Sequence, residues 1–276
     1  MGETFKKAGV VGWPIEQSKS PIIHGHWLEQ NGISGSYEKI AIEPANFEKD
    51  IQSLIADGYR GCNVTIPHKE AALAMADVVS DRAKAIGASN TLVFKDDKIH
   101  ADNTDGVGFI SNLKQLAPKW DAKLGPALVL GAGGAARAII YSLLQEGAPS
   151  VVIANRTQAK AQTLADFFGD HVTAITMDDV GNVLADTQTL VNTTSLGMVG
   201  QPDLVLDISA LPKTALVTDI VYNPLETDLL KQAKSLGLMT VDGIGMLLHQ
   251  AVPGFEAWFG TRPTVDDVLR EKVLSA

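Results

Sequence analysis

A glycine-rich turn near the middle of the chain constrains the fold more than any other feature. The apolar run Ala127–Leu130 is followed directly by Gly131-Ala132-Gly133-Gly134-Ala135-Ala136, and a helical pattern continues over Ala135–Gln145. The spacing matches G-x-G-x-x-A: one glycine allows a tight turn, another lets the backbone approach a pyrophosphate, and a small third residue lets helix and strand pack closely. A strand before the turn and a helix after it favour a dinucleotide site over a simple turn.

The end of the next strand indicates which dinucleotide binds. A carboxylate about 20 residues past the motif would bind the ribose 2′-hydroxyl of NAD. Asn155-Arg156-Thr157 stand there instead, with Lys160 one short turn later. Arg156 can pair with a 2′-phosphate, Thr157 can donate a hydrogen bond and Lys160 adds positive charge, whereas solvated side chains at a helix start are the alternative. The position in the motif favours NADP(H).

Short β-rich runs alternate with helical patterns along the chain, which predicts an α/β fold with a parallel sheet. In the first hundred residues the predicted strands are Gly9–Gly12, Tyr37–Ile42, Gly61–Thr65, Thr91–Phe94 and Lys98–Ala101, and the helices are Ile22–Gln30, Phe47–Asp57, Glu70–Met75 and Asp81–Ile86. The Pro- and Gly-containing segment Leu116–Pro126 interrupts the pattern. A Rossmann-type order follows, with strands Ala127–Leu130, Val151–Ala154, Leu190–Thr193, Leu216–Ile220 and Met239–Val241 and helices Ala135–Gln145, Gln158–Phe168, Met246–Phe259 and Thr264–Leu274.

Composition excludes several classes of partner. The 276 residues include 23 Lys+Arg and 32 Asp+Glu, a net charge of −9 that leaves no broad basic surface for nucleic acid. No stretch is apolar enough to span a membrane, and no secretory signal is recognisable. With the single cysteine Cys62, expected to be a small buried residue, we expect no intramolecular disulfide and a cytoplasmic location. Histidines such as His24 lack metal-ligand spacing and are expected to be satisfied or exposed, so no metal is implied.

Three segments carry small polar groups that core packing does not explain: Ser18-Lys19-Ser20-Pro21, Asn63-Val64-Thr65-Ile66-Pro67-His68-Lys69 and Asp102-Asn103-Thr104-Asp105-Gly106. In an extended backbone the Ser18 and Ser20 hydroxyls would point the same way and suit a carboxylate, although helix capping is the alternative. Lys69, beyond the strand end at Thr65, would face the rim of a sheet, or be a solvated charge. If Lys69 and Asp105 converge, they form an acid–base pair for a substrate hydroxyl; Asp105 could instead cap a helix.

Taken together, these motifs resemble the shikimate dehydrogenase family. The matching blocks run in order along nearly the whole chain: Gly12-Trp13-Pro14, Ser18–Pro21 with His24, Asn63–Lys69, Ala88-Ser89-Asn90-Thr91-Leu92, Asp102–Gly106, Gly131–Ala136, Asn155–Thr157, Asn192-Thr193-Thr194-Ser195-Leu196-Gly197-Met198, and Asp242-Gly243-Ile244-Gly245-Met246-Leu247 with Gln250. The resemblance implies reversible reduction of 3-dehydroshikimate to shikimate with NADPH, in the chorismate pathway to aromatic amino acids. It also implies a Rossmann-type NADP domain, 106–245, inserted into a smaller α/β substrate domain, 1–105, which the C-terminal helices 246–276 complete, with a cleft between the domains.

The resemblance also implies roles for individual residues. Lys69 and Asp105 would be the catalytic acid–base pair, and Ser18 and Ser20 would hold the substrate carboxylate, with Tyr222 nearby. The ring hydroxyls would be bound by Asn90, Asp105, Thr65 and Gln250, with Lys69 also in contact. The cofactor would contact Gly131, Ala132, Gly133, Gly134, Ala135, Asn155, Arg156, Thr157, Lys160, Thr193, Ile220, Gly243 and Met246.

The departures from the family pattern are small. His68 stands where a Phe is frequent, Gly25 stands where many relatives have Asn, and Ser20 in place of threonine favours shikimate over quinate. One alternative is an NAD-dependent quinate/shikimate dehydrogenase, which Arg156 argues against. Others are a non-catalytic NADP-binding sensor, which should have lost Lys69 or Asp105, and a Rossmann reductase for another substrate. Family members occur as monomers and dimers, so a monomer or homodimer is expected.

Overall fold

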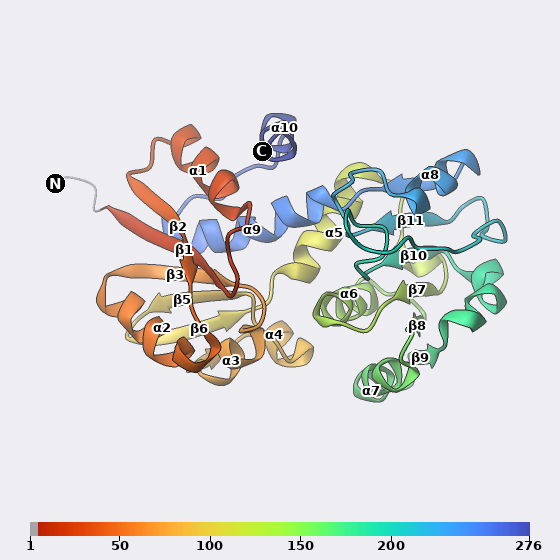
Figure 1. Ribbon diagram of the computed structural model, residues 1–276, viewed down its shortest axis with the longest axis horizontal. Helices are drawn as coiled ribbons and strands as arrows, with labels where there is room; N and C mark the ends of the chain where they lie inside the picture. Colours follow the sequence, from red (N-terminus) through yellow and green to blue (C-terminus); the bar gives the residue numbers. More distant parts are fainter. Residues whose placement is uncertain (1–4) are drawn as a thin grey trace. The chain divides into compact units, whose positions relative to one another are not determined.

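The computed structural model describes residues 5–276, which form two compact units (Figure 1). The first unit contains the chain up to Thr104 together with Leu248–Ala276, and the second is the intervening segment Asp105–Leu247. The chain therefore leaves the first unit, builds the second and returns. Among residues 5–276, no helix combines the length and apolar character needed to cross a bilayer.

The first unit is built on a mixed sheet. Its strands are β1 (Lys6–Gly12), β2 (Gly35–Ala41), β3 (Tyr59–Val64), β4 (Val78–Val79), β5 (Thr91–Lys95) and β6 (Lys98–Asp102), in the order β2-β1-β3-β5-β6-β4. The prediction of a parallel sheet is wrong at β5, which runs antiparallel to both β3 and β6. The reason is local: Asp96 and Asp97 both have positive φ, 54° and 55°, and form the two-residue turn that joins two strands as a hairpin.

The two faces of this sheet are covered by different helices. The unit contains α1 (Ser20–Gln30), α2 (Phe47–Ala56), α3 (Lys69–Ala74), α4 (Asp81–Ile86), most of α9 (Ile244–Phe259) and α10 (Asp267–Leu274). Cys62 and Val64 of β3 are buried in one core with Phe47 of α2. Side chains alternate along a strand, so Asn63 points to the opposite face. There its Oδ1 accepts from the hydroxyl of Tyr37, whose ring stacks on His24 of α1. The prediction that Cys62 is buried in a strand is confirmed.

The second unit has the strand order of a Rossmann domain. Its strands are β7 (Ala127–Leu130), β8 (Val151–Ala154), β9 (Val172–Ile175), β10 (Thr189–Asn192), β11 (Leu216–Asp219) and β12 (Met239–Val241), in the order β12-β11-β10-β7-β8-β9 with every neighbouring pair parallel. The order reverses beside β7, which creates the switch point at which such sheets bind dinucleotides. The α/β prediction is confirmed for both units.

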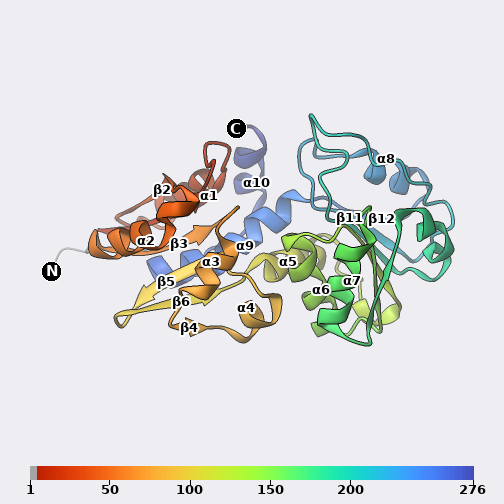
Figure 2. The ribbon, with the colours of Figure 1, turned by 60° about the horizontal axis from the view of Figure 1, so that its bottom comes forward.

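Helices cover both faces of the second sheet. They are α5 (Asp105–Leu116), α6 (Gly134–Gln145), α7 (Gln158–Phe168) and α8 (Asp228–Ser235). Val129 of β7 shares a core with α5, α6 and α7, whereas Leu128 and Leu130 pack with α8 on the other face (Figure 2). The sequence pattern predicts neither β9 nor α8. Only one of the four residues of β9 is buried, and α8 carries polar residues around a narrow apolar stripe, so neither segment gives a clear apolar pattern.

Candidate active site

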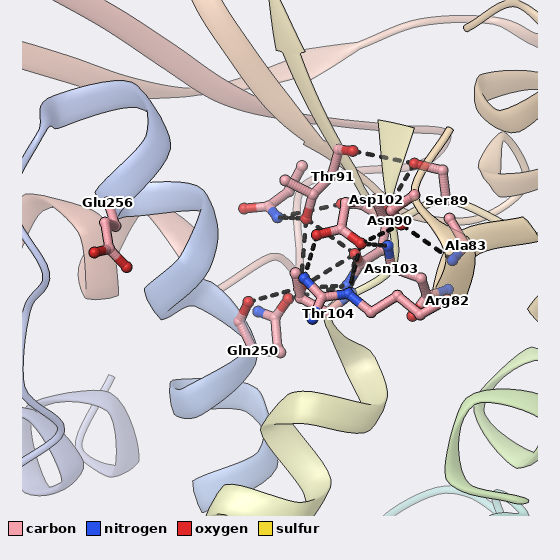
Figure 3. A network of polar contacts seen from close by, with 12 residues as sticks. Arg82, Ala83, Ser89, Asn90, Thr91, Asp102, Asn103, Thr104, Gln250 and Glu256 are labelled. Atoms are coloured by element: carbon pink, nitrogen blue, oxygen red, sulfur yellow. Dashed lines mark hydrogen bonds and ion pairs between the residues drawn. The ribbon is translucent and has the colours of Figure 1, made fainter. Parts of the chain in front are cut away.

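Two of the residues predicted to bind ring hydroxyls meet in the first unit (Figure 3). Asn90 lies directly before β5 and Gln250 lies on α9. The Nδ2 atom of Asn90 donates to Oε1 of Gln250 at 3.4 Å and to Oγ1 of Thr104 at 3.0 Å. The Thr104 hydroxyl in turn donates to the carbonyl oxygen of Gln250 at 2.8 Å. Asn90 and Thr104 are buried, so this cluster is a fixed part of the unit.

A charged residue supports the same segment from β6. The carbonyl oxygen of Asp102 accepts the N–H of Asn90 at 3.0 Å and the Ser89 hydroxyl at 2.9 Å. Its carboxylate accepts from the Ser80 hydroxyl at 2.6 Å and pairs with the Arg82 guanidinium (Figure 3). Burial raises the pKa of Asp102, but the bonds from Arg82 and Ser80 outweigh that effect and hold the pKa below its usual value. An ionised carboxylate therefore ties α4 to β6 beside Asn90.

The Ser18–Ser20 segment does not have the expected backbone. Lys19 has φ −90° and ψ −3°, so the prediction of an extended conformation with parallel hydroxyls is wrong. The helix α1 begins at Ser20, one residue before Pro21, and draws Lys19 into the helical region. The Ser18 hydroxyl oxygen accepts the N–H of Ser20 at 3.3 Å, and Lys19 Nζ donates to the carbonyl oxygen of Val273 at 3.0 Å. The role of the two serines in binding a carboxylate stays a prediction.

Lys69 lies at a helix start, five residues beyond the end of β3. Thr65 follows that strand, and its carbonyl oxygen accepts the N–H of His68 at 3.0 Å. The His68 ring stacks on Phe47 at 4.6 Å, where an aromatic residue of the family pattern would also fit. The carbonyl oxygen of Lys69 accepts the N–H of Ser89 at 2.9 Å, which joins the lysine segment to the residue before Asn90. Asp105 begins α5 in the second unit, and its pairing with Lys69 stays a prediction.

The glycine turn of the second unit fits a pyrophosphate. Gly131 has φ +105°, and a Cβ atom there would lie 2.7 Å from Oγ1 of Thr193 and 3.0 Å from Cγ2 of Thr194. Gly133 and Gly134 have no atom within 4 Å of the position that a Cβ would take. The backbone at the N-terminus of α6 is therefore open to a close ligand, and the first turn of the helix carries no acidic residue.

The predicted 2′-phosphate residues lie together at the end of β8. Asn155 follows the strand, and its Nδ2 donates to the carbonyl oxygen of Thr157 at 2.8 Å, which closes the turn before α7. Arg156, Thr157 and Lys160 are exposed at the start of that helix. Two cations and a hydroxyl suit a phosphate, and Asn155–Thr157 contain no carboxylate of the kind that binds the 2′-hydroxyl of NAD.

Sequence reasoning missed a buried pair, Asp219 and Asn192, that supports two loops of the second unit. Asp219 ends β11 with 1% of its surface exposed and accepts from Nδ2 of Asn192 at 3.0 Å, the N–H of Val221 at 2.9 Å and the Thr227 hydroxyl at 2.8 Å. Burial raises the pKa of Asp219, and these hydrogen bonds oppose the rise. Oδ1 of Asn192 also accepts from the N–H of Thr194 at 3.0 Å. The available signal was a polar residue at the end of a buried apolar strand.

The pair holds loops that carry predicted cofactor residues. Thr193 follows Asn192, and its hydroxyl donates to the carbonyl oxygen of Leu130 at 2.6 Å, next to the glycine turn. Ile220 follows Asp219. A Cβ on Gly243 would collide with the carbonyl oxygen of Ile220, so glycine is required where these segments touch. The carboxyl ends of the neighbouring strands β10, β11 and β12 thus bring Thr193, Ile220 and Gly243 to one edge of the sheet.

Two further residues of the predicted site, Met246 and Tyr222, also lie in the second unit. Met246 lies on the first turn of α9, three residues after Gly243. Tyr222 is partly buried in the second unit, and burial raises its pKa. Its place beside a substrate carboxylate stays a prediction.

The histidine prediction needs one correction. His24 is fully buried, and neither of its ring nitrogens has a hydrogen-bond partner within the described part of the chain, so the expectation of a satisfied or exposed histidine is wrong. Its ring stacks on Tyr37 at 3.8 Å, and burial lowers its pKa to about 3. Over residues 5–276, no cluster of His, Cys, Asp and Glu side chains has the geometry to hold a metal ion.

The chain is similar to known proteins over nearly its whole length. Residues 10–92 match the shikimate dehydrogenase substrate binding domain, residues 114–244 match shikimate / quinate 5-dehydrogenase, and residues 243–271 match the shikimate 5′-dehydrogenase C-terminal domain. The shikimate dehydrogenase (NADP(+)) of Paracoccus denitrificans is 54% identical over 269 residues, covering 97% of this chain and 95% of the relative.

Solved structures of similar proteins have the same fold. Shikimate 5-dehydrogenase from Thermus thermophilus, in complex with NADP(H) and shikimate, is 35% identical with a TM-score of 0.85, covering 98% of each chain. Quinate dehydrogenase from Corynebacterium glutamicum, in complex with NAD, is 32% identical with a TM-score of 0.90, covering 99% of this chain and 100% of the other. The sequence identity over nearly the full length, with the matching domains in order, places this chain in the shikimate dehydrogenase family.

Proposed function

We propose that the protein catalyses the reversible NADPH-dependent reduction of 3-dehydroshikimate to shikimate, a step toward chorismate and the aromatic amino acids. The observation that carries the proposal is the buried polar cluster of the first unit, in which Asn90 bonds to Gln250 and the Lys69 backbone bonds to Ser89. This cluster occurs in a chain that is 54% identical to a shikimate dehydrogenase (NADP(+)). Residues 1–105 with 246–276 would bind the substrate, and residues 106–245 would bind NADP(H).

The chain's own residues divide the work of binding. Ser18 and Ser20 hold the substrate carboxylate, with Tyr222 nearby. The ring hydroxyls bond to Asn90, Gln250 and Thr65, whose amide and hydroxyl groups can both donate and accept. Fixed polar partners of this kind select a hydroxylated ring, because an analogue lacking one hydroxyl leaves a buried polar group unpaired.

A proton must reach the substrate oxygen as its carbonyl is reduced. NADPH, when bound, supplies the hydride that reduces the carbonyl carbon. Lys69 donates the proton to the oxygen and removes it in the reverse direction. Asp105 favours the charged form of the lysine, since a nearby carboxylate stabilises an ammonium. Asp105 also contacts a ring hydroxyl.

The second unit orients the cofactor. The open backbone of Gly131–Ala135 receives the pyrophosphate at the N-terminus of α6. Arg156, Thr157 and Lys160, beside Asn155, bind the 2′-phosphate. Thr193, Ile220, Gly243 and Met246 line the nicotinamide end. We expect the enzyme to act in the cytoplasm as a monomer or homodimer.

Absorbance at 340 nm tests the proposal with the purified protein, crossing shikimate and quinate with NADP⁺ and NAD⁺. Fast reduction with shikimate and NADP⁺ alone supports both the substrate and the role of Arg156. Activity with quinate or NAD⁺ would instead support a quinate/shikimate dehydrogenase. A protein that binds NADP⁺ but reduces it with neither substrate would be a sensor or a reductase for another substrate.

A further inference from the structure

We propose that Tyr37, Asn63 and Thr91 form a positioning relay that fixes the side-chain amide of Asn90 for substrate binding. The inference rests on the proposed function, in which Asn90 bonds to a ring hydroxyl. The three relay residues are 8%, 5% and 3% exposed, so they act from beneath the site. Sequence reasoning assigned a function to none of them.

The relay is a continuous series of hydrogen bonds. The Tyr37 hydroxyl donates to Oδ1 of Asn63 at 2.6 Å. Nδ2 of Asn63 donates to Oγ1 of Thr91 at 3.3 Å. The Thr91 hydroxyl donates in turn to Oδ1 of Asn90 at 2.9 Å; Figure 3 shows these last two residues. Asn63 and Thr91 each accept one hydrogen bond and donate the next, so the series runs in one direction from the Tyr37 hydroxyl to the Asn90 oxygen.

Backbone groups fix that direction at both ends. Nδ2 of Asn63 also lies 3.2 Å from the carbonyl oxygen of Asn90, which can only accept, so the amino group of Asn63 must face it. Oδ1 of Asn63 then faces Tyr37, whose hydroxyl must donate. The N–H of Thr104 lies 2.8 Å from Oδ1 of Asn90 and can only donate. A flipped Asn90 amide would set an amino group against this N–H and against the Thr91 hydroxyl proton.

The first member of the relay is held as a donor. Burial raises the pKa of Tyr37 well above its usual value, so its hydroxyl keeps its proton across the working pH range. The His24 ring stacks on the Tyr37 ring with 3.8 Å between centroids and an interplanar angle of 4°. On the intervening strand β1, Ala8 is the register partner of Tyr37 and Val10 is that of Asn63, so the phenol reaches Asn63 diagonally across β1.

The consequence is a fixed choice of donor and acceptor at the site. The Asn90 oxygen accepts from the Thr91 hydroxyl and from the N–H of Thr104, while its amino group donates to the Thr104 hydroxyl and to Gln250. Binding a hydroxylated ring then requires no reordering of the Asn90 side chain, which lowers the entropic cost of association. Loss of the relay should weaken shikimate binding and leave the cofactor unaffected.

Two conservative substitutions and a matched control test the relay. Tyr37→Phe removes only the donating hydroxyl, and Thr91→Val removes the last link at nearly constant volume. Tyr59→Phe is the control, because Tyr59 lies on the same sheet and its hydroxyl donates to the exposed Glu38 carboxylate at 2.9 Å. Steady-state kinetics gives kcat and the KM values for shikimate and NADP⁺, and thermal unfolding reports whether each variant is folded.

We expect the KM for shikimate to rise about tenfold in Tyr37→Phe and in Thr91→Val, with kcat and the KM for NADP⁺ within about twofold of wild type. The KM for shikimate of the double variant should be no higher than that of the more affected single variant, because both substitutions act through Asn90. Thr91→Val gives the decisive result if Tyr37→Phe does not fold. The relay would be overturned if a folded variant kept the wild-type KM for shikimate, or if the KM values for shikimate and NADP⁺ rose equally. It would also be overturned if the two substitutions had additive effects, or if Tyr59→Phe caused the same change. A wild type without activity toward shikimate would overturn the proposed function, and the relay with it.

Discussion

The two units present different parts of the chain to a ligand. In the first, Asn63, Asn90 and Thr104 are 5%, 3% and 0% exposed. The Asn63 side chain donates to the carbonyl oxygen of Asn90, and the Asn90 side chain donates to the Thr104 hydroxyl. In the second, Gly133 and Gly134 are exposed and present backbone with open space above it. A hydroxylated ring is recognised by side-chain donors and acceptors held in fixed orientations, whereas a pyrophosphate needs N–H groups and a close approach.

The two units also differ in the partners of the buried or partly buried carboxylate that supports each region. Asp102 pairs with Arg82, and its hydrogen bonds hold its pKa below the usual value. Asp219 is buried against Asn192, Val221 and Thr227, and burial raises its pKa. One unit fixes its binding segment with an ion pair, and the other with neutral donors. Substitutions that remove the partners of Asp102 or of Asp219 should therefore act on the segment that each carboxylate holds and leave the other segment unaffected.

The largest effect should come from the first unit. Lys69→Ala should lower kcat by about a hundred- to ten-thousandfold, the usual contribution of a positioned acid or base, with little change in the KM for shikimate. Steady-state assays at saturating substrate measure this. Lys84→Ala, an exposed lysine on α4, is the matched control. Preserved turnover at saturation with weakened binding would contradict the assignment of Lys69.

A change in the glycine turn should act on the cofactor. Gly131→Ala should raise the KM for NADP⁺ by about tenfold or more, because its Cβ would lie 2.7 Å from Oγ1 of Thr193 and displace the loop. The KM for shikimate should stay unchanged. Gly169→Ala is the control: it has a similar φ of +81° but no atom within 4 Å. Equal effects of both substitutions would show that backbone strain alone is responsible.

Removing one cation should shift the choice of dinucleotide. Arg156→Gln should reduce the preference for NADP⁺ over NAD⁺ by about ten- to a hundredfold, the range expected for one charge-assisted hydrogen bond. The ratio of kcat/KM for the two cofactors measures this. Arg262→Gln, an exposed arginine of the first unit, should leave the ratio unchanged. An unaltered preference in Arg156→Gln would assign 2′-phosphate recognition elsewhere.

The smallest expected effect concerns stability. Arg82→Met should lower the free energy of unfolding by about 1 kcal/mol at neutral pH, since the pair is partly exposed. The folded pKa of Asp102 lies below the usual value of 3.8, so the pair stabilises the fold above that pH. The difference between wild type and variant should therefore shrink as pH falls below 3.8. Urea unfolding at several pH values measures it, and a difference independent of pH would contradict the ion pair.

Local signals predicted much of this molecule. The Gly131–Ala136 turn and the strand Ala127–Leu130 are adjacent in sequence, so their geometry follows from the residues themselves. The Asn155–Thr157 turn is similarly local. Such features need no knowledge of distant contacts.

The rest depends on contacts between distant residues. Tyr37 meets Asn63 only because β1 lies between β2 and β3, and strand order cannot be read from either segment alone. Ser18 and Ser20 were expected in an extended backbone, but α1 begins at Ser20 and turns Lys19 into the helical region. The predicted helix began only at Ile22, two residues later than the observed one.

Isothermal titration calorimetry tests the division of recognition most directly, with shikimate and NADP⁺ titrated separately into wild type, Asn90→Ala and Arg156→Gln. We predict that Asn90→Ala weakens shikimate binding by about tenfold or more and leaves NADP⁺ binding unchanged, and that Arg156→Gln does the reverse. Two results would contradict this division of recognition between the units. One is that each substitution weakens the binding of shikimate and of NADP⁺ equally, and the other is that Asn90→Ala binds shikimate as tightly as wild type does.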